Sequence, residues 1–400
     1  MLAYVFPPDN YSGADRPYRF TKYLRQLGHP VTVLAAGEKD GVHLQGEEVY
    51  RVRGELQHLP RKNRAEQIAR IAFLSYDEGA TWVPRAVGAA KRWMRNSPVP
   101  VVFSTSPPVT THLAALWVKR KYGARWIADF RDPLCGNPFR NLLRARLSDK
   151  LIERQIFRHA DVVLANTELV ADMWRLRYPD ARNRIHVIWN GFDPDTVLPA
   201  LPIPERPRKT LTHIGLIYGT RQPTILLRSI ERLTRQLRLD ANSLLVRLFG
   251  PAELEPASAE LVEHMRSKDM VDFQPNQMPR DQSARLTAES DYLLLLDVLQ
   301  EGSGLQVPAK LFEYIMIGRP ILALTVRGSS VEQILSRCGI PHECIYPDIA
   351  EADLDAIVMK FFSYSSIPTV PSAWFTENFD ARTQAAFLSR LISNSAPRTE

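Results

Sequence analysis

Cysteine is scarce in this chain, and that scarcity excludes two kinds of protein. The 400 residues hold three cysteines, Cys135, Cys338 and Cys344, and none of them belongs to a CxxC pair. Such a set supports neither a disulfide framework nor a multi-cysteine metal site. Free cysteines are usual in reducing compartments, so the sequence predicts a cytoplasmic protein.

Long apolar runs are also missing. No stretch of eighteen apolar residues occurs, and the run Tyr292–Leu296 is bounded by an aspartate on each side. A membrane-spanning helix needs about 20 predominantly apolar residues. The first residues lack the basic region and the apolar core of a signal peptide. We therefore expect neither a spanning helix nor secretion.

Acidic charge is scarce in the first half of the chain. Basic residues outnumber acidic ones by ten over residues 1–200, whereas residues 201–400 carry a net charge of −3. Residues 51–150 alone hold 19 basic and 7 acidic residues. This balance favours a polyanion, an anionic membrane surface or a phosphorylated acceptor as partner, and a solvated basic face is the alternative. No RNP motif, zinc finger or helix-turn-helix pattern occurs, so we expect no nucleic acid.

Short apolar segments alternate with amphipathic segments in two rounds. The first round predicts strands at 2–6, 31–35, 101–103, 126–130, 162–165 and 185–189, and helices at 15–27, 109–122 and 168–177. The second predicts strands at 211–214, 244–249, 292–296 and 321–324, and helices at 222–237, 256–267, 281–289 and 308–317. Such alternation is typical of parallel, doubly wound sheets.

Proline separates the two rounds. Residues 198–209 contain four prolines, which interrupt helices and sheets, so we interpret this segment as a linker. The sequence therefore predicts an α/β protein with two Rossmann-like doubly wound domains, 1–200 and 205–375, that face a cleft. Ligands bind such sheets at the carboxyl ends of the strands, and a cleft between domains is a preferred site. Residues 368–376 are expected to be irregular, and 380–393 to form a last amphipathic helix.

One segment of the second round carries a nucleotide-like pattern. Pro308 suits the first turn of a helix and Gly318 suits its end. Lys310 and Glu313 are three residues apart and share one helix face. The loop before them, Glu-Gly-Ser-Gly at 301–304, opens onto a helix N-terminus, where free N–H groups and the helix dipole favour a phosphate. A glutamate one turn further can accept from both ribose hydroxyls, and a solvent-exposed Lys–Glu pair is the alternative.

Six segments with a recognisable pattern follow one another along the chain. They are Tyr-Ser-Gly at 11–13, Gly-His-Pro-Val-Thr-Val-Leu at 28–34, Ser-Pro-Pro at 106–108 with Asp-Phe-Arg-Asp-Pro at 129–133, Ile-Trp-Asn-Gly-Phe-Asp at 188–193, His-Ile-Gly-Leu-Ile-Tyr at 213–218 followed by Arg221, and 310–322. Together they resemble the retaining GT-B glycosyltransferases of the large GT4 group. The pair at 106–133 is similar to a bacterial polysaccharide subgroup. The matches run from residue 2 to about 325.

The resemblance implies roles for five donor-binding residues. Glu313 is the expected ribose acceptor, and Arg221 would reach the donor diphosphate with its fixed fork of donors. Lys310 would either neutralise the diphosphate or only pair with Glu313. Gly13 would let the backbone approach the sugar phosphate without a Cβ in the way. Gly215 lies in the segment that opens the donor domain.

The sequence also departs from the family pattern. Members often carry a second glutamate eight residues before the one matching Glu313, but Leu305 stands there and Glu301 is out of register. Where many members have an active-site histidine, this chain has Arg131 followed by Asp132. We predict these two as catalytic candidates that bind sugar hydroxyls or the acceptor, and an Asp–Arg pair that holds a loop is the alternative. His112, on a predicted helix, is expected to be structural.

The implied activity is transfer of a sugar from a nucleotide-diphosphate donor to a hydroxyl acceptor, with retention. The resemblance further implies that residues 1–200 bind the acceptor, that 205–375 bind the donor, and that 376–400 cross back to the first domain. The expected acceptor is a lipid-linked intermediate or a glycan in bacterial surface or exopolysaccharide assembly. No cofactor and no metal are expected, because Asp193-Pro-Asp195 lies at a domain boundary rather than between strands. The alternatives are a nucleotide-sugar epimerase on the same scaffold and a degenerate nucleotide-sugar-binding protein.

The basic balance of the first domain predicts where the protein works. Basic clusters occur at 61–64, 91–95 and 119–121, and Trp82, Trp93 and Trp117 lie in or beside basic segments. Tryptophan tolerates a headgroup interface, and Lys or Arg near an anionic surface is attracted to it. We therefore expect peripheral attachment to the inner face of an anionic membrane. The alternative is that the clusters are dispersed and that Trp93 and Trp117 belong to the core.

Overall fold

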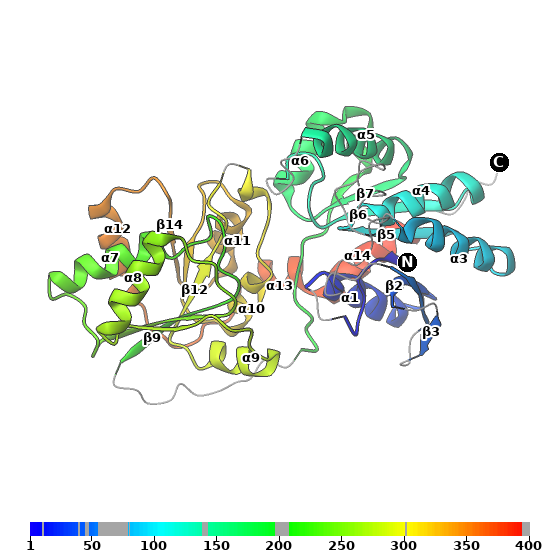
Figure 1. The fold of residues 1–400 in the computed structure, drawn as a ribbon. Helices are drawn as coiled ribbons and strands as arrows, with labels where there is room; N and C mark the ends of the chain where they lie inside the picture. The colour runs from blue at the N-terminus through cyan, green and yellow to red at the C-terminus, as the bar shows by residue number, and fades with distance from the viewer. Residues whose placement is uncertain are drawn as a thin grey trace. The chain divides into compact units, whose positions relative to one another are not determined.

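The chain divides into two compact α/β units. One unit comprises Met1–Asp193 and Asn378–Glu400, and the other comprises Pro194–Glu377. The computed structural model describes residues 1–9, 12–38, 41–44, 48–54, 79, 81–137, 143–196, 208–300 and 302–393. The first unit begins in blue and ends in red in Figure 1, because the last helix of the chain belongs to it.

The N-terminal unit is built on an eight-stranded sheet with the order β3-β4-β2-β1-β5-β6-β7-β8. All neighbouring strands pair in parallel except β3 and β4, which are antiparallel. The strands are β1 (Leu2–Ala3), β2 (Val33–Gly37), β3 (Gly41–Leu44), β4 (Glu48–Arg53), β5 (Val101–Ser106), β6 (Arg125–Phe130), β7 (Val162–Ala165) and β8 (Ile185–Val187). The strand order reverses between β1 and β5, which makes their carboxyl ends the expected ligand position in this unit.

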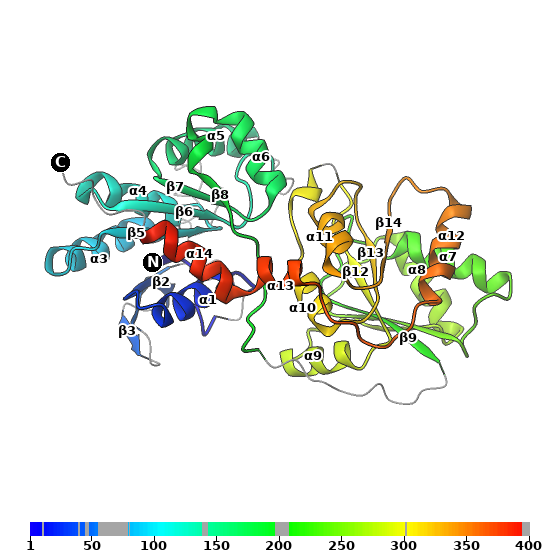
Figure 2. The same cartoon turned by 180° about the vertical axis from the view of Figure 1, so that it is seen from behind.

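Helices cover both faces of this sheet. The helices are α1 (Ser12–Gln26), α3 (Trp82–Asn96), α4 (Thr110–Tyr122), α5 (Leu143–His159), α6 (Glu168–Arg177), the 3-10 helix η1 (Pro179–Arg184) and α14 (Ala381–Ser393). On one face Phe20 of α1 and Leu388 of α14 share a cluster with Phe103 and Ile127, and Figure 2 shows α1 and α14 side by side. On the other face, Phe130 packs against aromatic rings of α5 and α6.

The C-terminal unit has a six-stranded parallel sheet with the order β11-β10-β9-β12-β13-β14. Numbered within the unit this is 3-2-1-4-5-6, the order of a dinucleotide-binding Rossmann sheet. The strands are β9 (Lys209–Ile214), β10 (Leu244–Phe249), β11 (Val271–Gln274), β12 (Tyr292–Leu296), β13 (Ile321–Leu324) and β14 (His342–Ile345). The switch point lies between β9 and β12, where the connections leave in opposite directions.

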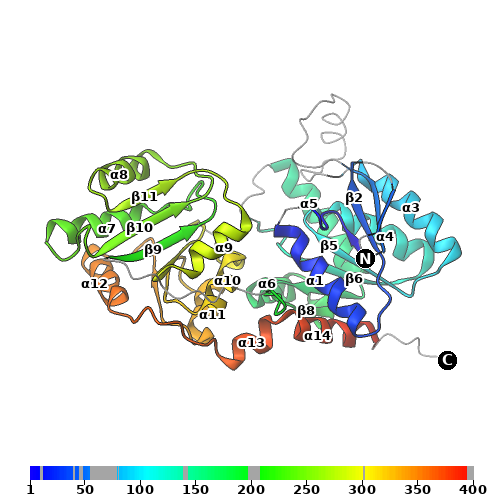
Figure 3. The same cartoon turned by 90° about the horizontal axis from the view of Figure 1, so that it is seen from below.

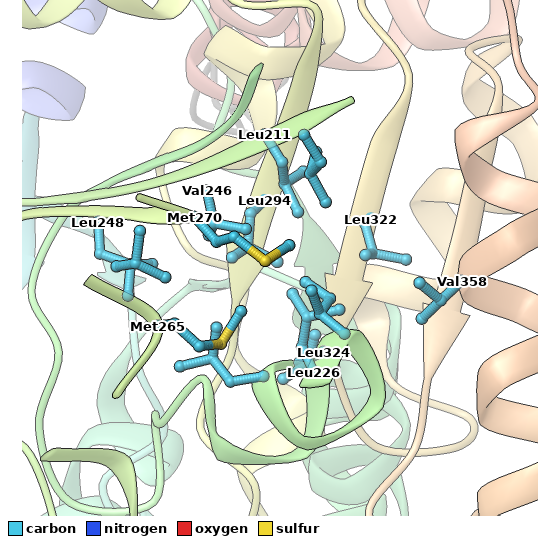
Figure 4. Close-up of a cluster of buried hydrophobic side chains, with 14 of the residues drawn as sticks. Leu211, Leu226, Val246, Leu248, Met265, Met270, Leu294, Leu322, Leu324 and Val358 are labelled. Carbon is cyan, nitrogen blue, oxygen red and sulfur yellow. The ribbon is translucent and has the colours of Figure 1, made fainter. Parts of the chain in front are cut away.

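The core of the C-terminal unit is mainly aliphatic. The helices are α7 (Thr224–Arg235), α8 (Pro256–Ser267), α9 (Arg280–Ala288), η2 (Ser303–Leu305), α10 (Lys310–Ile317), α11 (Ser330–Cys338), α12 (Glu351–Phe362) and α13 (Ala373–Phe379). Figure 4 shows how Leu226 of α7, Met265 of α8 and Val358 of α12 meet strand residues such as Val246 and Leu294. Figure 3 shows α7 with α8 and α12 beside it.

The predicted architecture of two doubly wound α/β units is confirmed, and three local expectations are wrong. The first strand spans only Leu2–Ala3 and not residues 2–6. Of the segment 368–376, expected to be irregular, residues 368–372 are irregular but 373–376 belong to α13. Helix α10 begins at Lys310, so Pro308 precedes it. Most of the proline-rich linker, Glu301 and the cluster 61–64 lie outside the described residues.

Candidate functional site

The switch point of the C-terminal sheet brings together four of the five predicted donor-binding residues. Gly215 follows the last residue of β9, and Arg221 closes the loop that leaves it. Lys310 and Glu313 stand at the first turns of α10, which follows β12. In a sheet of this order, ligands bind outside the carboxyl ends of the strands at the switch point. The four residues therefore lie where a nucleotide site is expected.

Arg221 is held in a tight turn. Its backbone N–H donates to Tyr218 O at 2.9 Å, and Gly219 in the turn has a φ of +51°. The guanidinium carbon lies 5.2 Å from the centre of the Tyr218 ring, and the side-chain Nε is buried without a hydrogen-bond partner. Thr220 Oγ1 accepts from the Leu299 N–H at 3.1 Å, which ties this turn to the loop after β12. The two loops of the switch point thus form one linked surface.

Two buried titratable groups lie under this surface. Burial lowers the pKa of His213 to about 4, and the charges of Arg221 and Lys310 act in the same direction. His213 Nδ1 lies 3.1 Å from Leu294 O, whereas Nε2 is buried without a partner. Burial raises the pKa of Asp297 to about 6, opposed by bonds from Val298 N–H and Thr325 Oγ1 and by the charge of Arg221. The imidazole is therefore neutral at pH 7, and it leaves the positive potential of the site to Arg221 and Lys310.

Lys310 and Glu313 form the ion pair that their spacing predicts. Lys310 Nζ lies 3.0 Å from Glu313 Oε2 and 3.4 Å from Ser283 Oγ. Their side chains are 36% and 25% exposed, while Leu311 and Phe312 beside them are buried in the core. Both charged groups therefore remain accessible to a ligand, and the pairing does not decide between the two roles considered for Lys310.

Gly215 lies at a close approach of two chain segments. Its N–H donates to Phe249 O at 2.9 Å, and a Cβ on Gly250 would lie 2.5 Å from Gly215 O. A Cβ on Gly215 itself would meet His213 Nε2 at 3.2 Å and His213 Cε1 at 3.3 Å. A side chain at 215 would therefore crowd the unpartnered imidazole nitrogen of His213.

A shallow polar cavity elsewhere in this unit is not part of the switch point. It has a volume of about 430 Å³, and its charged lining residues are Arg208, Glu263, Arg266, Asp269 and Asp272. These residues lie near the amino ends of β10 and β11 or on α8. Ligands of such sheets bind at the opposite, carboxyl ends, so we assign this cavity no role in donor binding.

Arg131 and Asp132 follow β6 at the carboxyl edge of the N-terminal sheet. Arg131 Nε donates to Ser106 O at 3.0 Å and Nη2 donates to Pro107 O at 2.5 Å. Burial lowers the pKa of Arg131, and burial raises the pKa of Asp132 against the opposing charge of Arg131. Arg131 therefore holds the loop after β5 through backbone carbonyls. The partners are not those of the Asp–Arg pair considered from the sequence.

Gly13 lies against Arg131 in the N-terminal unit, whereas the other four predicted donor residues belong to the C-terminal unit. It is the second residue of α1, in the N-terminal unit, and a Cβ on it would lie 2.2 Å from Arg131 Nη1. The absence of a side chain at 13 thus makes room for the guanidinium. The structure brings Gly13, Arg131 and the loop after β5 into one cluster at the switch point of the N-terminal sheet.

This contact predicts the effect of a single methyl group. Gly13→Ala must displace the Arg131 guanidinium and break its bonds to Ser106 O and Pro107 O, at a cost of about 1–3 kcal/mol typical of overpacking. Urea denaturation and sugar-transfer assays measure stability and activity. Gly88→Ala on α3 is the matched control, because its Cβ would meet only Arg92 Nη1 at 3.9 Å. Equal stability of the two variants would contradict the packing of Gly13 on Arg131.

Sequence reasoning missed two buried arginines that build this edge. Arg16 Nη2 donates to Asp129 Oδ1 at 2.7 Å and to Ile188 O at 2.8 Å, and Nη1 donates to Trp189 O at 2.6 Å. Arg51 donates to Phe6 O, Pro7 O and Ala36 O, and pairs with Asp9 at 3.2 Å. Both arginines engage backbone carbonyls of the loops after the strands. Their partners are distant in sequence, so no local motif could indicate them.

His112 is structural, as expected from its place on a helix. Its side chain is 0% exposed, and Nδ1 lies 2.8 Å from Ser104 Oγ, which accepts from Trp126 Nε1 at 2.7 Å. Burial lowers the pKa of His112 to about 3, and its ring centre lies 4.4 Å from that of Phe130. A neutral imidazole inside the core cannot reach a ligand at the edge of the sheet.

The described part of the chain holds neither a metal-binding cluster nor a membrane-spanning helix. Among those residues, no group of three or more His, Cys, Asp and Glu side chains could hold a metal ion. No helix there combines the length and the apolar character needed to cross a bilayer.

Comparisons with solved structures define the fold class of the whole chain. Sucrose-phosphate synthase from Thermosynechococcus elongatus matches with a TM-score of 0.64 at 13% identity, over 96% of this chain and 93% of that one. The lipopolysaccharide outer core galactosyltransferase WaaB matches with 0.61 at 14% identity, over 98% of each chain. Anabaena HepE in complex with UDP-glucose matches with 0.58 at 12% identity, over 98% of each chain. A UDP-N-acetylglucosamine 2-epimerase shares the fold with a TM-score of 0.51. The two units therefore form a GT-B fold.

The sequence comparison adds the family. The model of glycosyltransferase family 4 matches residues 17–196, which is most of the N-terminal unit and just under half of the chain. No curated protein matches the sequence. The N-terminal unit thus matches glycosyltransferase family 4, and the chain as a whole is similar to glycosyltransferases of the GT-B fold.

Proposed function

We propose that this enzyme transfers a sugar, with retention, from a nucleotide-diphosphate sugar to a hydroxyl acceptor in bacterial surface or exopolysaccharide assembly. The observation that carries the donor half of the proposal is the grouping of Arg221, Lys310 and Glu313 at the switch point of the C-terminal sheet. HepE, a structural neighbour, is seen with UDP-glucose, and WaaB is a galactosyltransferase of the lipopolysaccharide outer core. Both names support, by analogy, a nucleotide-sugar donor and a surface-glycan product.

The charges of the site suit each part of the donor. Glu313 can accept from the two ribose hydroxyls, and Arg221 presents a planar fork to diphosphate oxygens. Lys310, now paired with Glu313 at 3.0 Å, supplies a second cation between the two. Preorganised cations of this kind stabilise the negative charge that grows on the leaving diphosphate.

The proposed transfer needs no dedicated base. The bond between the anomeric carbon and the phosphate oxygen breaks, and the acceptor oxygen bonds to that carbon on the same face. The acceptor proton passes to the departing phosphate oxygen, so atoms and charge balance. Arg221 and Lys310 hold the diphosphate throughout. In the N-terminal unit we propose that Asp132 and the loop fixed by Arg131 contact the acceptor or the sugar hydroxyls.

Ligand-induced stabilisation tests the donor half directly. The purified chain is heated with UDP, GDP, dTDP, ADP or CMP, and a ligand that binds only the native state stabilises it by about 2.7 kcal/mol at a hundredfold excess over Kd. One nucleoside diphosphate is expected to raise Tm clearly more than the others. If none of the five nucleotides raises Tm, the proposed nucleotide site is refuted.

Arg221 gives a prediction about turnover. Arg221→Lys keeps the charge and loses the fork, so kcat/KM for the nucleotide sugar should fall by about tenfold or more, while Tm stays nearly constant. Steady-state kinetics with varied donor measure the effect, and Arg228→Lys on the exposed side of α7 is the matched control. An unchanged kcat/KM in the first variant would exclude Arg221 from the donor site.

Two other functions share the scaffold. An epimerase is favoured by the solved 2-epimerase of similar fold, and a degenerate binding protein is favoured by Leu305 where the family often has a glutamate. Release of nucleoside diphosphate that depends on acceptor supports the transferase. Inversion of the donor sugar without acceptor would support the epimerase, and tight nucleotide binding without turnover would support the binding protein.

We also propose a peripheral place on the inner face of an anionic membrane, where a lipid-linked acceptor would be presented. The structure corrects this expectation for Trp82. Trp82 is 0% exposed in the core, and Trp93 packs against Tyr50 with ring centres 5.6 Å apart. Trp82 therefore cannot reach a headgroup layer, whereas Trp93 and Trp117 are only half-buried.

A further inference from the structure

Three neighbouring helices of the N-terminal unit present an outer surface of one charge. Helix α3 packs against α4, and α4 packs against α5, so the three form one layer on the sheet (Figure 3). Nine side chains with exposed positions on them are basic: Arg85, Lys91, Arg92, Arg95, Arg120, Lys121, Lys150, Arg154 and Arg158. Among the side chains described on these helices, none of the exposed ones is acidic. We call this set the basic layer.

The acidic residues of α5 point away from this surface. Asp149 and Glu153 are buried at 2% and 0% exposure. Glu153 accepts from the Cys135 N–H at 2.8 Å, and from Arg177 and Tyr178 at 2.9 Å each, all inside the unit. The net charge of α5 is therefore less positive than the charge of its outer face. That the acidic residues are buried and the basic ones exposed could not be deduced from composition.

Two exposed leucines lie within the basic face of α5. Leu147 and Leu151 are 68% and 65% exposed, one helical turn apart. Together with Lys150, Arg154 and Arg158 they form a single stripe, because residues three and four apart share a helix face. A large apolar side chain in this position is unfavourable in water and favourable in a lipid headgroup layer, where amphipathic helices with basic flanks bind.

The surroundings of the stripe on α5 are also positively charged. Arg120 of α4 reaches α5, where Nη2 donates to Gln155 Oε1 at 3.2 Å and lies 2.9 Å from His159 Nε2. The pKa of His159 is lowered, first by burial and then by the positive charges of Arg120, Arg158 and Lys119. Lys119 is paired with Asp161 at 2.7 Å, and α6 beyond it carries Glu168 and Asp172 beside Arg175. The positive surface therefore ends at α5.

We infer that the basic layer is a docking surface for an anionic lipid bilayer, with Leu147 and Leu151 entering the headgroup region. The inference rests on the proposed membrane location and names the surface and the inserting residues. The charge attracts any polyanion, but the paired leucines specify an interface with an apolar interior. Nucleic acid would meet these leucines with phosphate and sugar, which offer them no favourable environment.

Vesicle binding tests the inference. The full chain is sedimented with vesicles of phosphatidylcholine alone or with one third phosphatidylglycerol, at low and high salt. Binding is expected only to the anionic vesicles and is expected to weaken with salt. Each Lys or Arg near an anionic surface contributes roughly fivefold to partitioning, so Lys150→Glu, Arg154→Glu and Arg158→Glu together should lower it more than about 100-fold.

Two further variants separate charge from insertion. Leu147→Ser with Leu151→Ser should reduce partitioning by about tenfold or more and leave its salt dependence unchanged. The matched control reverses three exposed cations of the C-terminal unit, Arg228→Glu, Arg238→Glu and Lys268→Glu, and should bind vesicles as the wild type does. Equal binding to both lipids, no binding to either, or an equal loss in the control would overturn the inference.

Nucleotide binding and RNA binding, measured on the same variants, distinguish a failure of this inference from a failure of the proposed function. The stabilisation of each variant by nucleoside diphosphate should match that of the wild type, since the basic layer and the donor residues belong to different units. Failure of donor binding with intact vesicle binding would refute the proposed function and leave the docking surface standing. Binding of RNA oligonucleotides that survives the leucine substitutions, together with absent vesicle binding, would show that the surface serves nucleic acid instead.

Discussion

Asp129→Ala is expected to destabilise the N-terminal unit by about 3–5 kcal/mol, because it leaves the Arg16 guanidinium buried without its counter-ion. Arg16 and Asp129 have side chains 3% and 0% exposed and lie 2.7 Å apart, and Thr105 Oγ1 also donates to Asp129 at 2.7 Å. For a unit of this size the loss corresponds to a Tm decrease of roughly 6–20 °C. Calorimetry of the full chain measures it, with bound nucleotide marking the transition of the C-terminal unit.

Two variants show whether the loss comes from the unpaired charge. Asp172→Ala removes the partner of Arg175 in an exposed pair of the same unit, and should cost less than about 1 kcal/mol. Arg16→Met with Asp129→Leu replaces both charges by apolar side chains and should recover most of the stability lost in Asp129→Ala. If the double variant is as unstable as the single one, the backbone carbonyls held by Arg16 matter more than the ion pair does.

This ion pair also shows why part of the site could not be predicted. Arg16 and Asp129 are 113 residues apart in the sequence. Each has an oppositely charged residue closer to it in the sequence that could form an ion pair equally well. Asp129 lies in β6, and its carboxylate accepts from Arg16 of α1 and from Thr105 of the neighbouring strand β5. The pairing therefore depends on the order of strands and helices, which the sequence predicts only in outline.

Local chemistry, in contrast, was predictable. The i, i+3 spacing of Lys310 and Glu313 predicted a shared helix face, and the structure shows the ion pair. The apolar run Tyr292–Leu296 between two aspartates predicted the central strand β12. Asp297, which follows it, could have been noticed as a carboxyl at the carboxyl end of a strand. Its raised pKa arises from burial beneath the loop of Arg221, and no local pattern indicates that.

The basic clusters at 91–95 and 119–121 could be predicted from the sequence only in part. The excess of basic residues over 51–150 was evident from counting, and the exposed cations of α3 and α4 confirm that they lie on the surface. The stripe on α5 was not predicted, because Asp149 and Glu153 dilute its charge in the sequence. Only the burial of those two carboxyls shows that the outer face of the helix is basic.

Glu313→Ala should weaken binding of the preferred nucleoside diphosphate by about 10–100-fold, since a hydrogen bond to a charged group contributes about 1.5–3 kcal/mol. The side chain is accessible and is not part of the core, so Tm without ligand should change little. Titration calorimetry measures Kd. Glu231→Ala on α7, which removes the partner of Arg235, is the matched control and should bind as the wild type does.

A chemical change in the ligand identifies what Glu313 contacts. If the carboxylate accepts from the ribose, the wild type should bind the 2′-deoxy nucleotide less tightly than the ribonucleotide, and Glu313→Ala should bind the two equally. Lys310→Met, which removes the paired cation, should keep the preference for ribose while it lowers the affinity for both nucleotides. If Glu313→Ala retains the full preference for ribose, the glutamate acts only by positioning Lys310, and the ribose contact must be assigned to another residue.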